Sequence, residues 1–200
     1  MAIRTTLLEA VNQMLSCIGG SSVVSLDTDN PEIASAVAIL EETTRVVLSE
    51  GWNFNTEREY PFAPDVNDEI LVPDNLISFT LSGSKHSSDY QVVERQGKLY
   101  DKLAHSYKFT KTIYCDVLWG FTWVECPQPF KEYITARASR NYASRLVTSK
   151  ELVELIAQDE GSCRALCIAY DTDTAQSTMF GLYNGQRSFN TFMPFNTLAR

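Results

Sequence analysis

The stretch from Asn30 to Asn55 constrains the fold more than any other part of the chain. Asn30 suits the cap of a helix, Pro31 its first position and Glu32 the positive end of its dipole. Apolar residues then recur at steps of three and four and form one stripe with a single threonine: Ile33, Ala36, Val37, Leu40, Thr44, Val47 and Leu48. Gly51 is expected to end this helix, because glycine adopts the left-handed conformation without a Cβ penalty.

Two aromatic residues follow that glycine directly. Trp52 and Phe54 are two positions apart, so in an extended strand both side chains would point to the same side. We interpret Gly51, Trp52 and Phe54 as structural anchors, at the joint where a helical body meets a second kind of structure. A ligand site is not expected there.

Helical spacing of apolar residues returns in three further segments, at 5–18, 127–149 and 150–173. The last of these is expected to be capped by Thr148 or Ser149, with Gly161 as a weak point or kink. Its apolar residues at helical spacing are Leu152, Leu155, Ile156, Cys163, Leu166, Cys167 and Tyr170. With the helix that starts at Asn30, these segments predict an antiparallel bundle of about four helices.

Between Trp52 and Cys126 the period changes to short stretches rich in β-branched and aromatic residues. The expected strands lie at 76–83, 90–95, 98–102 and 111–121. Turn signals separate them, among them Pro61, Pro64 and Gln96-Gly97, and the last of these is typical of a tight hairpin. An antiparallel β region is therefore predicted.

These segments together predict an α+β fold. Residues 1–51 and 127–174 form a helical bundle domain, residues 52–126 an inserted β domain, and residues 175–200 an extended C-terminal arm. The arm segment has no acidic residue and no helical stripe. It contains five large aromatic residues: Phe180, Tyr183, Phe189, Phe192 and Phe195. Such a segment is typical of an arm that becomes ordered on another surface, and the alternative is a tail that packs on its own domain.

The formal net charge of −8 disfavours a protein that grips nucleic acid by its phosphates. An ordered basic set, Arg137, Arg140 and Arg145, lies on the third predicted helix. We expect it to pair with acidic residues of a neighbouring helix or a neighbouring subunit rather than with phosphates. Neither a membrane span nor a signal peptide is expected, so we expect the chain to be made and to work in the cytoplasm.

No catalytic motif of a known class is present, and we expect no enzyme and no cofactor. The five scattered cysteines are interpreted as buried reduced thiols and the two histidines, His86 and His105, as solvated loop residues. Carboxylates could in principle hold a cation or serve a hydrolase, although capping and solvated roles are favoured. The carboxylates considered for both roles are Asp65, Asp68 and Glu69, and a second pair considered for a cation alone is Asp171 with Asp173.

Five segments carry a resemblance to a known family. They are AVNQMLSCIGGSSVVSL (10–26), SEGWNFNTE (49–57), VPDNLISF (72–79), GKLYD (97–101) and ECPQPFKEYITARASRNYASRLV (125–147). In order and spacing they resemble the tail tubular protein A family, the head–tail adaptors of short-tailed podoviruses of the autographivirus type. No segment is a catalytic signature, and the combination carries the resemblance.

The resemblance implies a structural virion protein at the head–tail junction. Its copies would form a homo-oligomeric ring of twelve between the capsid portal protein and the tail nozzle, tail tubular protein B. DNA would leave the head through the central channel without specific binding, and no membrane would be involved. The resemblance implies no catalytic, metal or cofactor-binding residues. A tail-associated, carboxylate-dependent hydrolase is the alternative.

Overall fold

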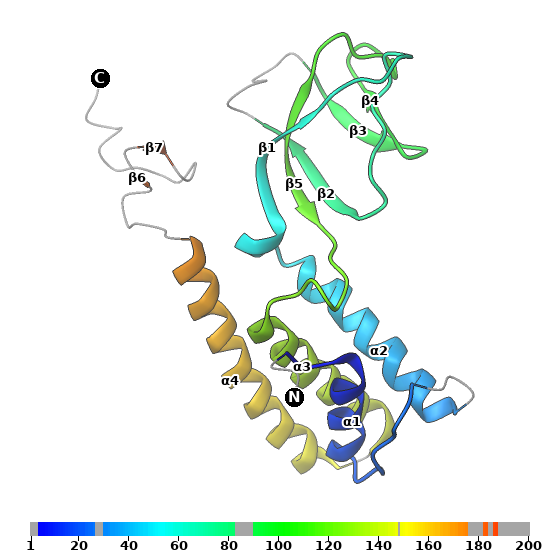
Figure 1. Ribbon diagram of the computed structural model, residues 1–200, viewed down its shortest axis with the longest axis vertical. Coiled ribbons are helices and arrows are strands. Elements are labelled where there is room, and N and C mark those ends of the chain that lie inside the picture. The colour runs from blue at the N-terminus through cyan, green and yellow to red at the C-terminus, as the bar shows by residue number, and fades with distance from the viewer. Residues whose placement is uncertain are drawn as a thin grey trace.

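The computed structural model describes residues 4–26, 30–82, 90–147 and 149–175, together with the backbone of residues 182–183 and 186–187. It has a mixed α+β fold, as the sequence predicts. The molecule is elongated, with the helices gathered at one end and the main strands at the other (Figure 1).

The helical part contains four helices in the described ranges. They are α1 (Leu7–Cys17), α2 (Pro31–Leu48), α3 (Gln128–Leu146) and α4 (Lys150–Ala175). Helix α3 lies in the middle and packs against each of the other three (Figure 1). The predicted bundle is therefore present, with the fourth helix running without interruption through its glycine.

Side-chain capping groups begin the first two helices, and the cap at Asn30 is the one that the sequence predicts. The Asn30 side chain accepts a hydrogen bond of 3.0 Å from the Glu32 N–H at the start of α2. Thr6 and Glu9 form a reciprocal capping box at the start of α1. Gly51 has φ +78°, so it takes the left-handed conformation just beyond the end of α2.

The strands form small antiparallel sheets. Strands β1 (Thr56–Phe62), β5 (Ile113–Trp119) and β2 (Leu76–Leu81) pair in that order, with β5 in the centre. Strands β3 (Val92–Arg95) and β4 (Lys98–Asp101) form a hairpin, and β6 (Leu182–Tyr183) pairs with β7 (Gln186–Arg187). The β3–β4 turn has positive φ at Gln96 and Gly97, as the hairpin prediction requires.

Strand β1 is absent from the sequence prediction, which places a turn at Pro61. In the structure Pro61 lies inside β1, opposite Tyr114 of β5. An edge strand tolerates proline because only one of its sides must pair with a neighbour. β1 also contains Glu59 with φ +53°, at an irregularity where the Asp116 carboxylate accepts the Glu59 N–H.

Two hydrophobic clusters lie in the two parts. The helical cluster is built on buried side chains of all four helices, and the β cluster on those of the strands and their connections. The half-buried Phe121, after β5, packs against both clusters. Division into domains at residues 51 and 126 stays a prediction.

Candidate subunit interface and the joint that supports it

The chain turns sharply after α2 instead of extending. The sequence predicts a strand through Trp52 and Phe54, but residues Asn53–Asn55 form a short 3-10 turn, η1. That prediction is wrong because the Asn55 side chain accepts the Trp52 N–H at 2.9 Å and closes the turn.

Asn55 also ties the two parts of the molecule together. Its side-chain amide donates to the backbone carbonyl of Leu48, at the end of α2, and to that of Trp119, at the end of β5, at 2.9 and 3.0 Å. The residue is fully buried, so these partners replace the water that its amide would otherwise bind. Asn55 could not be identified from the sequence, because nothing in the residue pattern distinguishes a buried asparagine from one in a solvated turn.

The two aromatic residues of the joint face the helical core. Trp52 is 8% exposed, its Nε1–H donates to the Val47 carbonyl at 2.8 Å, and its ring meets the edge of Phe130 at 4.9 Å between centroids. Phe54 lies 4.4 Å from the same Phe130 ring. One phenylalanine of α3 therefore receives both side chains, which fixes where the β region leaves the bundle.

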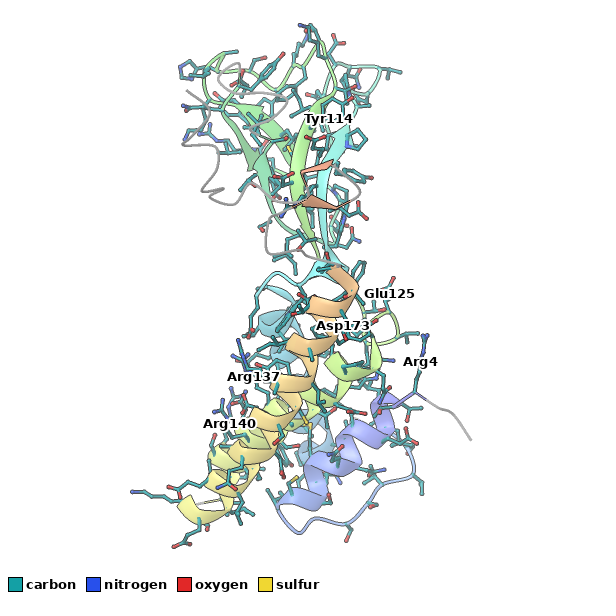
Figure 2. All side chains as sticks on the ribbon, turned by 90° about the vertical axis from the view of Figure 1, so that its left-hand side faces the viewer. Arg4, Tyr114, Glu125, Arg137, Arg140 and Asp173 are labelled. Carbon is teal, nitrogen blue, oxygen red and sulfur yellow. The ribbon has the colours of Figure 1, made fainter. Side chains whose placement is uncertain are left out.

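The three arginines of α3 form ion pairs within the chain. Arg140 reaches Glu160 of α4 at 2.8 Å, and Arg145 reaches Glu42 of α2 at 3.1 Å. Arg137 and Arg140 lie beside α4 on the same side of the helical part (Figure 2). Pairing of these arginines across a boundary between copies stays a proposal.

Glu50 is the centre of a polar network that connects three helices. Its carboxylate accepts hydrogen bonds or ion pairs from Arg137 of α3 and, at 3.2 Å, from Arg164 of α4. Both guanidinium groups also donate to the Tyr133 hydroxyl, at 3.1 and 2.7 Å. This network attaches α4 to α3 and to the end of α2 through charge as well as apolar contact.

Helix α4 buries much less of its surface than its apolar spacing predicts. Of its 26 residues, the structure buries Ile156 and Cys167. Leu155 and Leu166, which the predicted stripe includes, are 60% and 59% exposed. Both leucines stay exposed because α4 contacts the bundle mainly through α3, and no other helix of the described ranges covers its outer side (Figure 2).

The carboxylates weighed as a catalytic or cation site serve other roles. Asp65 accepts the backbone N–H groups of Glu69 and Asn67, and these bonds hold the pKa of the Asp65 carboxyl below its ordinary value. Glu69 pairs with Lys98 at 2.5 Å. Asp171 of α4 accepts the Asn53 N–H at 2.7 Å. These carboxylates therefore cap turns and bind a lysine.

The thiols and histidines show no arrangement for chemistry in the described residues. All five cysteines are free, and burial raises the pKa of the Cys115 and Cys167 thiols to about 12 and that of Cys126 to about 11. Cys17 and Cys163 are half-buried rather than buried. His105 is exposed in a turn, and His86 lies outside the described residues.

The described residues contain neither a cluster of metal-ligating side chains nor a helix suited to span a membrane. No group of three or more His, Cys, Asp or Glu side chains there is placed to hold a metal ion. None of the helices in the described ranges combines the length and the apolar character that a membrane span requires.

The predicted arm lies almost entirely outside the description. Residues 182–183 and 186–187 pair as β6 and β7, while the five arm aromatics belong to the residues whose side chains are not described. These aromatics are Phe180, Tyr183, Phe189, Phe192 and Phe195. Their role as a partner-binding arm stays a proposal.

Comparison with known proteins gives two findings. A family model described as "Tail tubular protein" matches residues 8–177, a range that spans the helical bundle and strands β1 to β5. The chain is also 31% identical over 122 residues to a protein named Tail tubular protein A of Klebsiella phage KP34. That match covers 60% of this chain and 62% of the relative, which is less than two thirds of the relative's length.

Proposed function

Because this chain belongs to the tail tubular protein family, we propose that it is a structural protein of a phage tail. The single observation that carries this proposal is the extent of the family match, which includes both the helical and the β part. A match confined to one part would support a shared module, whereas this one supports a shared role for the whole described body.

We propose more specifically that the chain is a head–tail adaptor. Its copies would form a ring, with twelve as the expected number, that joins the capsid portal to the tail nozzle around a channel for DNA. A closed ring needs heterologous contacts, in which one surface of a copy docks on a different surface of the next. The elongated body offers separate surfaces on its helical and β ends (Figure 1).

The joint at Asn55 supports such a role. An adaptor must hold its two ends at a defined angle, and a buried, fully bonded amide between α2 and β5 restricts rotation there. Trp52 and Phe54 add aromatic packing against one side chain of α3. We propose that Gly51, Trp52 and Phe54 act as structural anchors for this purpose.

Imaging of the purified protein with and without the portal protein of the same phage tests the proposal. The sample that contains the portal is needed because the family resemblance implies that copies can stay monomeric until a portal is present. We expect negative-stain images of the mixture to show rings on one end of the portal. Portal particles without added density, at saturating protein, would contradict the adaptor role.

The charge balance of the chain suits the proposed channel. A subunit with net charge −8 that lined a channel with acidic groups would repel DNA, which suits passage without binding. A ring structure whose lumen is lined by Arg137, Arg140 and Arg145 would contradict this part of the proposal.

We propose that the C-terminal arm, residues 175–200, contributes to assembly. Deleting the chain from Ala175 onward should leave a folded monomer but prevent its capture by the portal or the nozzle. Circular dichroism checks the fold and imaging checks the capture. Unchanged ring assembly by the truncated chain would count against the arm.

A further inference from the structure

Helix α4 has two exposed leucines, Leu155 and Leu166, on a side that its packing on α3 leaves open, and we call this side the outer stripe. Each leucine lies one position, about 100° around the helix, from a buried residue. Leu155 and Leu166 are eleven positions apart, which brings them within about 20° of one another around a helix of 3.6 residues per turn. Both are more than half exposed, at 60% and 59%. Ser162 and Ala169, which are also exposed, fall on the same side of the helix.

The same stripe is negatively charged. Asp159 and Asp173 lie between and beyond the two leucines on this side, and both are exposed. Helix α4 as a whole contains six carboxylates and two cationic side chains, for a net charge of −4. Figure 2 shows the helix along the outside of the bundle, with Asp173 near its C-terminal end. The surface therefore combines apolar anchors with acidic flanks.

The end of the chain has the complementary composition. Residues 176–200 contain no acidic residue, two arginines and five large aromatic residues. An aromatic side chain suits a contact with exposed leucine, and Arg187 and Arg200 suit contacts with aspartate. Helix α4 and residues 176–200 are therefore complementary both in charge and in apolar contact.

We propose that residues 176–200 of one copy dock on the outer stripe of α4 in a neighbouring copy. The inference rests on the proposed assembly of copies and names the segment and the surface that meet. Each copy supplies one arm and one α4 stripe, and these are different surfaces, so the contact is heterologous and can close a ring. Docking of an arm on its own α4 would use the same chemistry without joining copies.

Photo-cross-linking between full-length copies, mixed with the portal protein of the same phage, tests the proposal. A photoreactive phenylalanine analogue replaces Phe189, and isotopically heavy and light copies are mixed so that mass spectrometry separates links within a copy from links between copies. We expect heavy–light links to peptides of α4 that contain Leu155 or Leu166. In samples that show rings on the portal, links only within one copy, links only to peptides outside α4, or no links would each overturn the proposal.

A pair of surface variants supplies the matched control. The double substitution Leu155→Glu with Leu166→Glu should lower the yield of heavy–light links by more than about tenfold, since it removes both apolar anchors and adds repulsion to the stripe. Ile168→Glu on the same helix should leave the yield unchanged, because Ile168 is 49% exposed but faces another side. An equal loss in the control, or none in the double variant, would contradict the assignment of the surface.

The same samples separate this inference from the adaptor role. Rings on the portal in the double variant, with unchanged links, would remove the docking surface and leave the adaptor role standing. Absence of rings with wild-type protein, together with heavy–light links to α4, would support the docking and contradict the adaptor role. Circular dichroism confirms that each variant is folded.

Discussion

The neighbouring helices α3 and α4 have similar helical spacing of apolar residues but are used differently. Helix α3 buries ten of its 19 residues and contacts α1, α2 and α4. Helix α4 buries two of its 26 residues and packs mainly on α3. A helical period in the sequence thus shows that a side of a helix is apolar, but it does not show which molecule covers that side.

Under the proposed assembly, the difference assigns α3 to the stability of the fold and α4 to contacts between copies. Side chains of α3 hold the fold because they have partners within the same chain. The outer side chains of α4 contribute little to the fold, so we expect their substitution to affect contacts between molecules. A surface substitution on α4 that unfolds the chain, or a core substitution in α3 that leaves its stability unchanged, would contradict this division.

The largest loss of stability is expected at the joint against α3. Trp52→Ala should lower the free energy of unfolding by about 3–5 kcal/mol, because it removes a buried indole that packs on Phe130. Urea unfolding followed by circular dichroism measures the loss. The control Trp52→Phe keeps an aromatic ring and removes the bond to Val47, so it should cost about 1 kcal/mol. Wild-type stability in Trp52→Ala would refute the role of Trp52 as an anchor.

Truncation of a core side chain of α3 should lower the free energy of unfolding almost as much. Ile134→Ala is expected to cost about 2–5 kcal/mol, since Ile134 is fully buried in the helical cluster and truncation leaves a cavity. Its thermal unfolding midpoint should fall clearly below that of the wild type. A loss as small as that of a surface residue would mean that α3 is not the centre of the bundle.

How much of this could be predicted from the sequence depends on the kind of residue. Asn30 and the stripe behind it gave α2, because capping and period are local properties. Strand β1 was not predictable, since Pro61 is tolerated there only through its edge position in a sheet formed by distant residues. Asn55 was missed for the same reason, as one of its partners, Trp119, is 64 positions away.

The polar attachment of α4 should give a smaller and salt-dependent effect. Glu50→Gln is expected to lower the free energy of unfolding by about 1 kcal/mol, because Glu50 joins Arg137 and Arg164 in a partly exposed network. Urea unfolding at low and at high salt should show the loss shrinking as salt rises. The control Glu42→Gln, whose pair with Arg145 is more exposed, should change stability less. Equal losses of stability from the two substitutions would contradict a specific role of Glu50 in attaching α4.

The smallest effect on stability is expected on the outer side of α4. Leu166→Ala should change the free energy of unfolding by no more than about 0.5 kcal/mol, since the side chain is mostly exposed. The same substitution should reduce capture of the chain by portal-bound copies in a pull-down. A stability loss as large as that of Ile134→Ala would show that the outer stripe belongs to the fold.

Hydrogen–deuterium exchange tests most directly whether α4 is the assembly surface. The measurement compares the free chain with the chain assembled on its portal. Peptides from residues 150–175 should gain protection on assembly, whereas peptides from residues 128–146 should change little because α3 is already covered within the free chain. Rings on the portal in which residues 150–175 exchange as fast as in the free chain would contradict the claim that α4 is the assembly surface.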